Sequence, residues 1–183
     1  MIEINDTILY GTEGVCTVVD IVQRDFGGKS IPYYVLQPVY NNRSTIYVPV
    51  HNEALTAKMR RVLSKEEIYQ IIQAMPSETS IWIEDEPERK ETYKQILQQG
   101  DRIELVRMIK ALHQHQLDQR AKGKHLHTAD EHFFKEAEKL LYDEFALVLD
   151  IQPDEVLSFI MQQLDEDESS DKAKDNEAAS MAR

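Results

Sequence analysis

The first 50 residues alternate between short apolar segments and turn residues. Four segments are rich in Val, Ile, Thr and Tyr, a composition that is typical of strands. These segments are Thr7–Tyr10, Val15–Val22, Tyr33–Gln37 and Thr45–Val50. Glycine and asparagine residues separate them as turns, with Gly27 and Gly28 between the second and third. Short strands at this spacing predict a small antiparallel β-barrel.

From Ser64 onward the apolar positions follow helical spacing. Ser64 and Glu67 form a capping-box pattern, and Thr128 with Glu131 repeats it later. Gly100 is a helix stop signal, and the residue after it is an aspartate that can cap the next helix. The pattern predicts helices that begin near residues 64, 88, 101, 128 and 153, with a loop over 76–87.

A run of strands followed by a run of helices predicts an α+β chain built from separate domains. We expect a β-barrel domain over residues 1–63 and an all-helical domain over residues 64–164. Residues 165–183 are acidic, small and polar, which predicts a disordered tail.

Charge is distributed unevenly along the 183 residues, whose formal net charge is −12. This balance argues against indiscriminate nucleic-acid binding. Residues 89–135, however, hold ten Lys and Arg against six Asp and Glu, together with five of the six histidines. Basic side chains on adjacent helices can follow a phosphate backbone, so this segment is the candidate DNA-contacting region.

Two further features bear on the compartment. Cys16 is the only cysteine, so no intramolecular disulfide is possible, as is usual in a reducing environment. The N-terminus lacks the pattern of a signal peptide, and no apolar run is long enough to span a bilayer. We therefore expect a cytoplasmic protein without a membrane partner.

Motifs in both halves of the chain match one known family. In the β half the matching residues are Ile4–Thr7, Tyr10, Glu13–Val15, Asp20-Ile21, Tyr33–Leu36, Ile46–Pro49 and Arg60–Ser64. In the helical half they are Tyr93-Lys94, Leu97, Gly100-Asp101, Val106, Lys110, Leu112, Lys135–Ala137, Leu140-Leu141 and Glu144–Leu147. In this order the motifs resemble the CarD/CdnL/TRCF-like family of transcription regulators, over about residues 1–150.

The resemblance implies a function. Its N-terminal Tudor-like barrel would bind the β subunit of RNA polymerase. Its helices would contact promoter DNA, weakly and largely without sequence specificity, at the upstream edge of the bubble and so modulate the stability of the open complex. No enzymatic activity and no cofactor are implied, and the phosphate loop of the related helicase is absent. We expect a monomer when the protein is free.

The resemblance also assigns polymerase-binding residues. Arg24 occupies the position of a polymerase-contacting arginine, and Ile46, Tyr47, Val48 and Pro49 form the candidate docking strand. Relatives can have a basic residue where this chain has Tyr47. Tyr47 is either an aromatic anchor on the surface or a core residue, in which case Ile46 and Val48 face the other way.

The candidate DNA-binding residues are one aromatic and five cations. They are Trp82, Arg89, Lys90, Lys94, Arg102 and Lys110. Trp82 either wedges between base steps or packs in the core. Five acids lie between Trp82 and Tyr93 and oppose a close approach to phosphate. The cations are either phosphate contacts or ordinary solvated surface with ion pairs.

Two alternative functions remain open. The first is a protein–protein adaptor on RNA polymerase that makes no direct DNA contact. The second is a small metalloprotein or hydrolase that uses the histidines, of which His125, His127 and His132 flank a predicted helix start. No metal-binding or nucleophile motif supports the second alternative, so we expect no metal and no catalytic residues.

Overall fold

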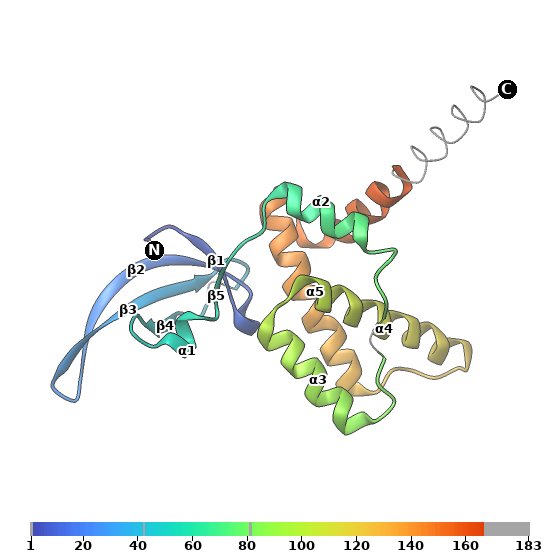
Figure 1. Ribbon diagram of the computed structural model, residues 1–183, viewed down its shortest axis with the longest axis horizontal. Helices are drawn as coiled ribbons and strands as arrows, with labels where there is room; N and C mark the ends of the chain where they lie inside the picture. The colour runs from blue at the N-terminus through green and yellow to red at the C-terminus, as the bar shows by residue number, and fades with distance from the viewer. Residues whose placement is uncertain (1, 42, 81, 167–183) are drawn as a thin grey trace.

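The computed structural model describes residues 2–41, 43–80 and 82–166. A β domain is followed by a helical domain, and the two lie side by side along the longest axis of the molecule (Figure 1). The α+β class and the order of the two parts are as the sequence predicts. Of the predicted acidic tail, residues 165 and 166 still belong to a helix, and residues 167–183 lie outside the described part of the chain.

The β domain is one antiparallel sheet of five strands in the order β4-β3-β2-β1-β5. The strands are β1 (Thr7–Tyr10), β2 (Val15–Phe26), β3 (Lys29–Pro38), β4 (Ile46–Pro49) and β5 (Met59–Arg61). Among the described residues β4 and β5 are not paired with each other, so the sheet stays open where a closed barrel was expected. The β2–β3 hairpin is long and curved, and its turn extends away from the helical domain (Figure 1).

This hairpin is longer than the sequence pattern predicts. Its ladder continues to the pair Phe26 and Lys29, and the turn uses Gly27 and Gly28, whose φ angles are 59° and 80°. Positive φ at both central residues matches the twist of the flanking strands and favours glycine. The added strand residues, such as Gln23, are polar and exposed, so they lack the alternation by which a strand is recognised.

Two short elements between β4 and the helical domain were not predicted. They are the single-turn helix α1 (Glu53–Thr56) and the strand β5. Asn52 caps α1 by accepting a hydrogen bond from the Leu55 amide. β5 is only three residues long and pairs with β1, which places it at the edge of the sheet opposite β4.

The helical domain consists of four longer helices and a C-terminal helical segment. These are α2 (Lys65–Ala74), α3 (Glu86–Gln99), α4 (Arg102–Ala121), α5 (Thr128–Leu149), the 3-10 turn η2 (Pro153–Glu155) and residues 156–166. The capping box of Ser64 and Glu67 is present, and Gly100 ends α3 with φ 62°. The second predicted capping box is wrong, because α5 begins after His127, which makes no side-chain capping bond.

The hydrophobic side chains form separate cores in the two domains. One core lies in the sheet, on the face that includes Cys16 and the buried Leu36. Two others lie among the helices, one around Tyr93 and one around Phe145. No described core cluster contains buried residues of both domains.

Within the described ranges, no helix is long and apolar enough to cross a membrane.

Candidate protein and nucleic-acid interfaces

The strand β4 forms one open edge of the sheet, and its side chains alternate between the two faces. Val48 is fully buried and Ile46 packs against the same core, whereas Tyr47 is 39% exposed on the opposite face. Of the two alternatives for Tyr47, the structure therefore shows the surface position. A period of two residues along a strand produces this arrangement.

Arg24 of β2 lies on the same face as Tyr47 of β4, although β3 runs between their strands. Tyr47 is in register with Val35 of β3, and Arg24 is in register with Ile31 of the same strand. The Arg24 guanidinium lies 3.7 Å from the centre of the Tyr47 ring. A cation–π contact of this kind orients an exposed arginine and reduces the rotamer entropy that it would lose on binding a partner.

Two of the candidate DNA-binding cations are buried in the helical domain. Arg89 of α3 is 4% exposed and binds Asp130 of α5 through two hydrogen bonds of 3.1 Å. Arg102 of α4 is 9% exposed and binds Glu144 of α5 at 2.7 and 2.9 Å. Neither guanidinium is available to a DNA phosphate in this structure, because a buried carboxylate already neutralises each of them.

The pKa of Arg89 reflects two opposing effects, the burial of its guanidinium and the attraction of Asp130. Burial alone would lower this pKa, but the hydrogen bonds and charge of Asp130 raise it above the ordinary value. Arg89 also donates to the backbone oxygens of Ile83 and Glu84. Its guanidinium therefore orders the segment that leads into α3, and with it the position of Trp82.

Lys110 binds the C-terminal end of α2. Its ammonium donates to the carbonyl oxygens of Met75 at 2.8 Å and Glu78 at 2.5 Å, and to that of Pro76 at 3.3 Å. A lysine at this position satisfies carbonyl groups that have no partner within the helix and complements the helix dipole. The structure thus gives Lys110 an intramolecular role.

Trp82 is half-buried and contacts the side chains of His115 and Arg89. The His115 ring of α4 stacks on it with 3.8 Å between centroids and 20° between planes. The Arg89 guanidinium carbon lies 4.5 Å from the indole centroid. Burial lowers the pKa of His115 below its ordinary value of 6.5, although Asp130 opposes the shift, so the stacked imidazole is neutral at pH 7. Trp82 is thus ordered by contacts at the margin of the core around Tyr93.

Lys90 and Lys94 are the exposed members of the candidate set. They lie one turn apart on α3, where residues four positions apart share a face. The ammonium of Lys90 forms an exposed ion pair with Glu86 at 2.5 Å. An exposed pair is worth little, so it can exchange for a phosphate at a small cost.

The histidines and the cysteine do not form a catalytic or metal-binding constellation in the described part of the chain. Its residues include no group of three or more His, Cys, Asp and Glu side chains that could hold a metal ion. Cys16 is fully buried in the sheet core, and burial raises the pKa of its thiol to about 12. A buried thiol of this kind behaves as a small apolar side chain.

Three residues that organise this region were missed by the sequence reasoning. Asp130 and Glu144 are buried carboxylates on α5, and His115 is the stacking partner of Trp82. Asp130 and Glu144 lie 41 and 42 positions from their arginines. Only the tertiary packing brings these pairs together. The one available signal was that both acids share a helical face with the apolar residues Phe134, Ala137 and Leu141 of α5.

Comparison with known families covers most of the chain. A family model described as the CarD-like/TRCF RID domain matches residues 2–63. A second model, described as the CarD C-terminal domain, matches residues 67–161. No individual curated protein matches the chain. The two matches meet at the boundary between the sheet and the helices, and the chain belongs to the CarD-like family of non-enzymatic, transcription-associated proteins that interact with RNA polymerase.

Proposed function

We propose that this protein binds the β subunit of RNA polymerase through the β4 edge and contacts promoter DNA through its helical domain. Acting in the cytoplasm without a cofactor, it would modulate the stability of the open promoter complex. A protein that binds the open promoter better than the closed one shifts the equilibrium by the difference in affinity.

The observation that carries the proposal is the open edge of β4 beside the Arg24–Tyr47 pair. An exposed strand edge can accept a partner strand through its main-chain groups. The adjoining face offers one aromatic and one arginine, the side chains that are enriched at binding hot spots. A polymerase segment that adds a strand at β4 would meet both groups.

The DNA-contacting surface is narrower than the sequence predicts. Lys90 and Lys94 of α3 are the exposed cations of the candidate set, and Trp82 lies near the start of the same helix. Arg89 supports that surface from beneath by holding Trp82. Weak DNA contacts are sufficient once the polymerase holds the helical domain near the promoter, because tethering raises its effective concentration.

A binding experiment on the full-length protein tests the polymerase-binding part. We expect the parent protein to bind polymerase core enzyme and a fragment of its β subunit. The variant Tyr47→Pro would remove the one amide of β4 that points away from β3 and is expected to abolish binding, whereas Ala57→Pro near the opposite edge is the matched control. Failure of the parent protein to bind polymerase would refute the proposal.

The alternative function is an adaptor without DNA contact. It is favoured by the acids near Trp82, and by the intramolecular roles of Arg89, Arg102 and Lys110. Crosslinking from Lys94 to promoter DNA within the polymerase complex distinguishes the two functions. A crosslink supports DNA contact, and its absence with intact polymerase binding supports the adaptor.

A further inference from the structure

The short strand β5 is bonded to both domains. On one side it pairs with β1 in the sheet. On the other, the carbonyl oxygen of Arg61 accepts a 3.0 Å hydrogen bond from Arg102 of α4. Two residues later, the amide of Leu63 donates to Glu144 of α5 at 2.9 Å. We call the Arg102 and Glu144 side chains, together with these two backbone groups, the interdomain clamp.

The interdomain clamp is buried and fully bonded. Glu144 is 1% exposed, and its two oxygens accept hydrogen bonds from Arg102 and from the Leu63 amide. A bidentate arginine–carboxylate pair fixes direction as well as distance, unlike a single flexible ion pair. The backbone that joins the sheet to α2 is therefore attached to the centre of the helical domain at two points.

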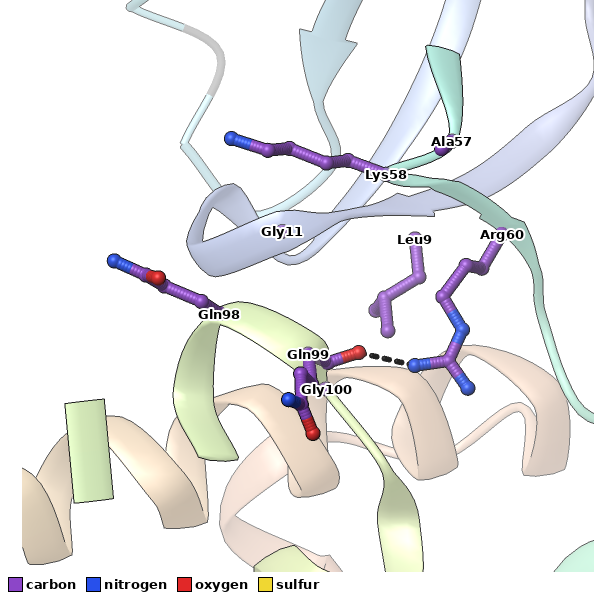
Figure 2. A pocket seen from close by; sticks show the side chains of 8 residues that line it. All are labelled: Leu9, Gly11, Ala57, Lys58, Arg60, Gln98, Gln99 and Gly100. Atoms are coloured by element: carbon purple, nitrogen blue, oxygen red, sulfur yellow. Dashed lines mark hydrogen bonds between the residues drawn. The ribbon is translucent and has the colours of Figure 1, made fainter. Parts of the chain in front are cut away.

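Outside the interdomain clamp, a cleft interrupts the contact between the two domains. A cleft of about 280 Å³ opens between the sheet and the end of α3, lined by residues that include Leu9, Lys58 and Gln98. Figure 2 shows Lys58 and Gln98 pointing to the same side of this cleft, while Arg60 reaches across to the carbonyl group of Gln99. Domains that meet through small, partly polar surfaces normally move relative to each other.

Other contacts across the interface are local. The Leu9 side chain lies against Gly100, and Leu140 of α5 lies against Gly14. These contacts place the turn between β1 and β2 against α3 and α5. The interdomain clamp, by contrast, attaches the chain on both sides of Val62, where a hinge between the domains would otherwise lie.

The location of the interdomain clamp gives it a consequence for function. β5 and β4 are the opposite edges of the five-stranded sheet. The proposed polymerase-binding edge at β4 is therefore four strand positions from the clamp. The sheet thus acts as a spacer between the proposed polymerase contact and the DNA-contacting helices.

We infer that Arg102 and Glu144 are positioning residues, which fix the helical domain relative to the β4 edge and so place its DNA-contacting helices at the promoter. This inference rests on the proposed function for its promoter part, whereas the fixed domain geometry stands independently of it. Neither residue needs to touch DNA or polymerase to act in this way.

The test replaces the ionic pair without opening the helical core. In the double variant Arg102→Met/Glu144→Leu, apolar side chains of similar size fill the space, an exchange that proteins often tolerate. The variant removes both bonds to the β5 connection. The matched control is Arg89→Met/Asp130→Leu, which replaces the other buried pair but bonds no residue of the sheet or of the connection.

Distances between two spin labels report the domain geometry. Labels are placed at Lys29→Cys on β3 and Gln114→Cys on α4, which are both exposed. Cys16 is buried and stays unlabelled. We expect a narrow distance distribution in the parent protein and in the control pair, and a clearly broader one in Arg102→Met/Glu144→Leu. An unchanged distribution in that variant would overturn the inference.

A second variant covers the case in which Arg102→Met/Glu144→Leu fails to fold, as judged by circular dichroism. Insertion of Gly-Ser between Val62 and Leu63 leaves the buried pair intact but lengthens the connection between its two bonded groups. We expect the same broadening of the distances. A distribution as narrow as that of the parent would again contradict the inference.

The promoter part is measured with Arg102→Met/Glu144→Leu and with the Gly-Ser insertion in a polymerase complex. We expect polymerase affinity within twofold of the parent, and roughly tenfold more protein for the half-maximal effect on promoter opening, because the effective concentration at the DNA falls. Broadened distances with an unchanged promoter effect would show that positioning is not needed. If the parent itself does not bind polymerase, the proposed function fails, while the distances still decide the geometry.

Discussion

The guanidinium of Arg24 lies 3.7 Å over the ring of Tyr47, although the two residues belong to strands that are separated by β3. The contact holds the arginine along the sheet face beside the β4 edge. It also covers part of the ring in the free protein. The pair therefore behaves as one preformed anchor, and loss of either member should affect the other.

The first prediction concerns this anchor. Arg24→Glu and Tyr47→Ala should each weaken polymerase binding by roughly 30-fold, as expected for a hot-spot residue worth about 2 kcal/mol. The double variant should be less than additive, because each single change already breaks the pair. Biolayer interferometry with polymerase core measures the affinities. Lys58→Glu, near the opposite edge of the sheet, is the charge-reversal control, and an equal loss in that variant would contradict the prediction.

The second prediction concerns the exposed lysines of α3. Lys90→Glu/Lys94→Glu should reduce the effect on promoter opening while polymerase affinity stays within twofold. The slope of log K for DNA association against log salt concentration should become less steep by about 0.9 for each lysine that no longer neutralises a phosphate. Lys65→Glu on α2 reverses an exposed charge outside the candidate DNA-contacting region and should leave both measurements unchanged. Equal promoter effects in the parent, the double lysine variant and the control variant would favour the adaptor function.

The third prediction concerns the pH dependence of the Trp82 stack. Because burial lowers the pKa of His115, its contribution to stability is present above the ordinary pKa of 6.5 and is lost as the pH falls through the lower, folded value. Trp82 is the only tryptophan, so its fluorescence reports the stack directly. We expect a reversible change below about pH 6.5. The variant His115→Phe should abolish it, and persistence of the change in that variant would assign it to another group.

The fourth prediction concerns the buried pair of α3 and α5. Arg89→Met alone leaves Asp130 buried without its partner and should destabilise the protein by about 3–5 kcal/mol. Arg89→Met/Asp130→Leu should recover most of that loss, since no buried charge then remains unpaired. Urea denaturation followed by circular dichroism gives the free energies of unfolding. A double variant as unstable as the single one would show that the pair contributes by more than neutralising its own charges.

The fifth prediction uses Cys16 as a reporter of the β domain. Burial raises the pKa of its thiol to about 12, so the folded protein should not react with a thiol reagent at pH 8. Its contribution to stability is present below the ordinary pKa of 9.0 and is lost as the pH rises toward 12. Labelling should begin only in denaturant that unfolds the sheet. Rapid labelling of the folded protein would show that the core of the sheet opens readily.

Local signals in the sequence predict the elements better than they predict the sites. The Ser64 capping box and the Gly100 stop are visible because capping chemistry acts within a few residues. The β2–β3 extension was missed because its residues are exposed and polar. The roles of Arg89 and Arg102 could not be predicted, because a basic residue on a helix looks the same in a sequence whether it faces solvent or a buried acid. Their partners, Asp130 and Glu144, are more than 40 positions away.

The short β4 edge also bears on whether the free protein can pair with itself. β4 has only four residues, and its last, Pro49, has no amide hydrogen to offer a neighbouring strand. A second copy could therefore form only a brief ladder along this edge, and brief or proline-ended edges are a common defence against aggregation. The side chains of the anchor must supply what the ladder lacks, so a partner without a matching carboxylate and apolar surface gains little from this strand. We therefore expect the free protein to remain a monomer even at high concentration.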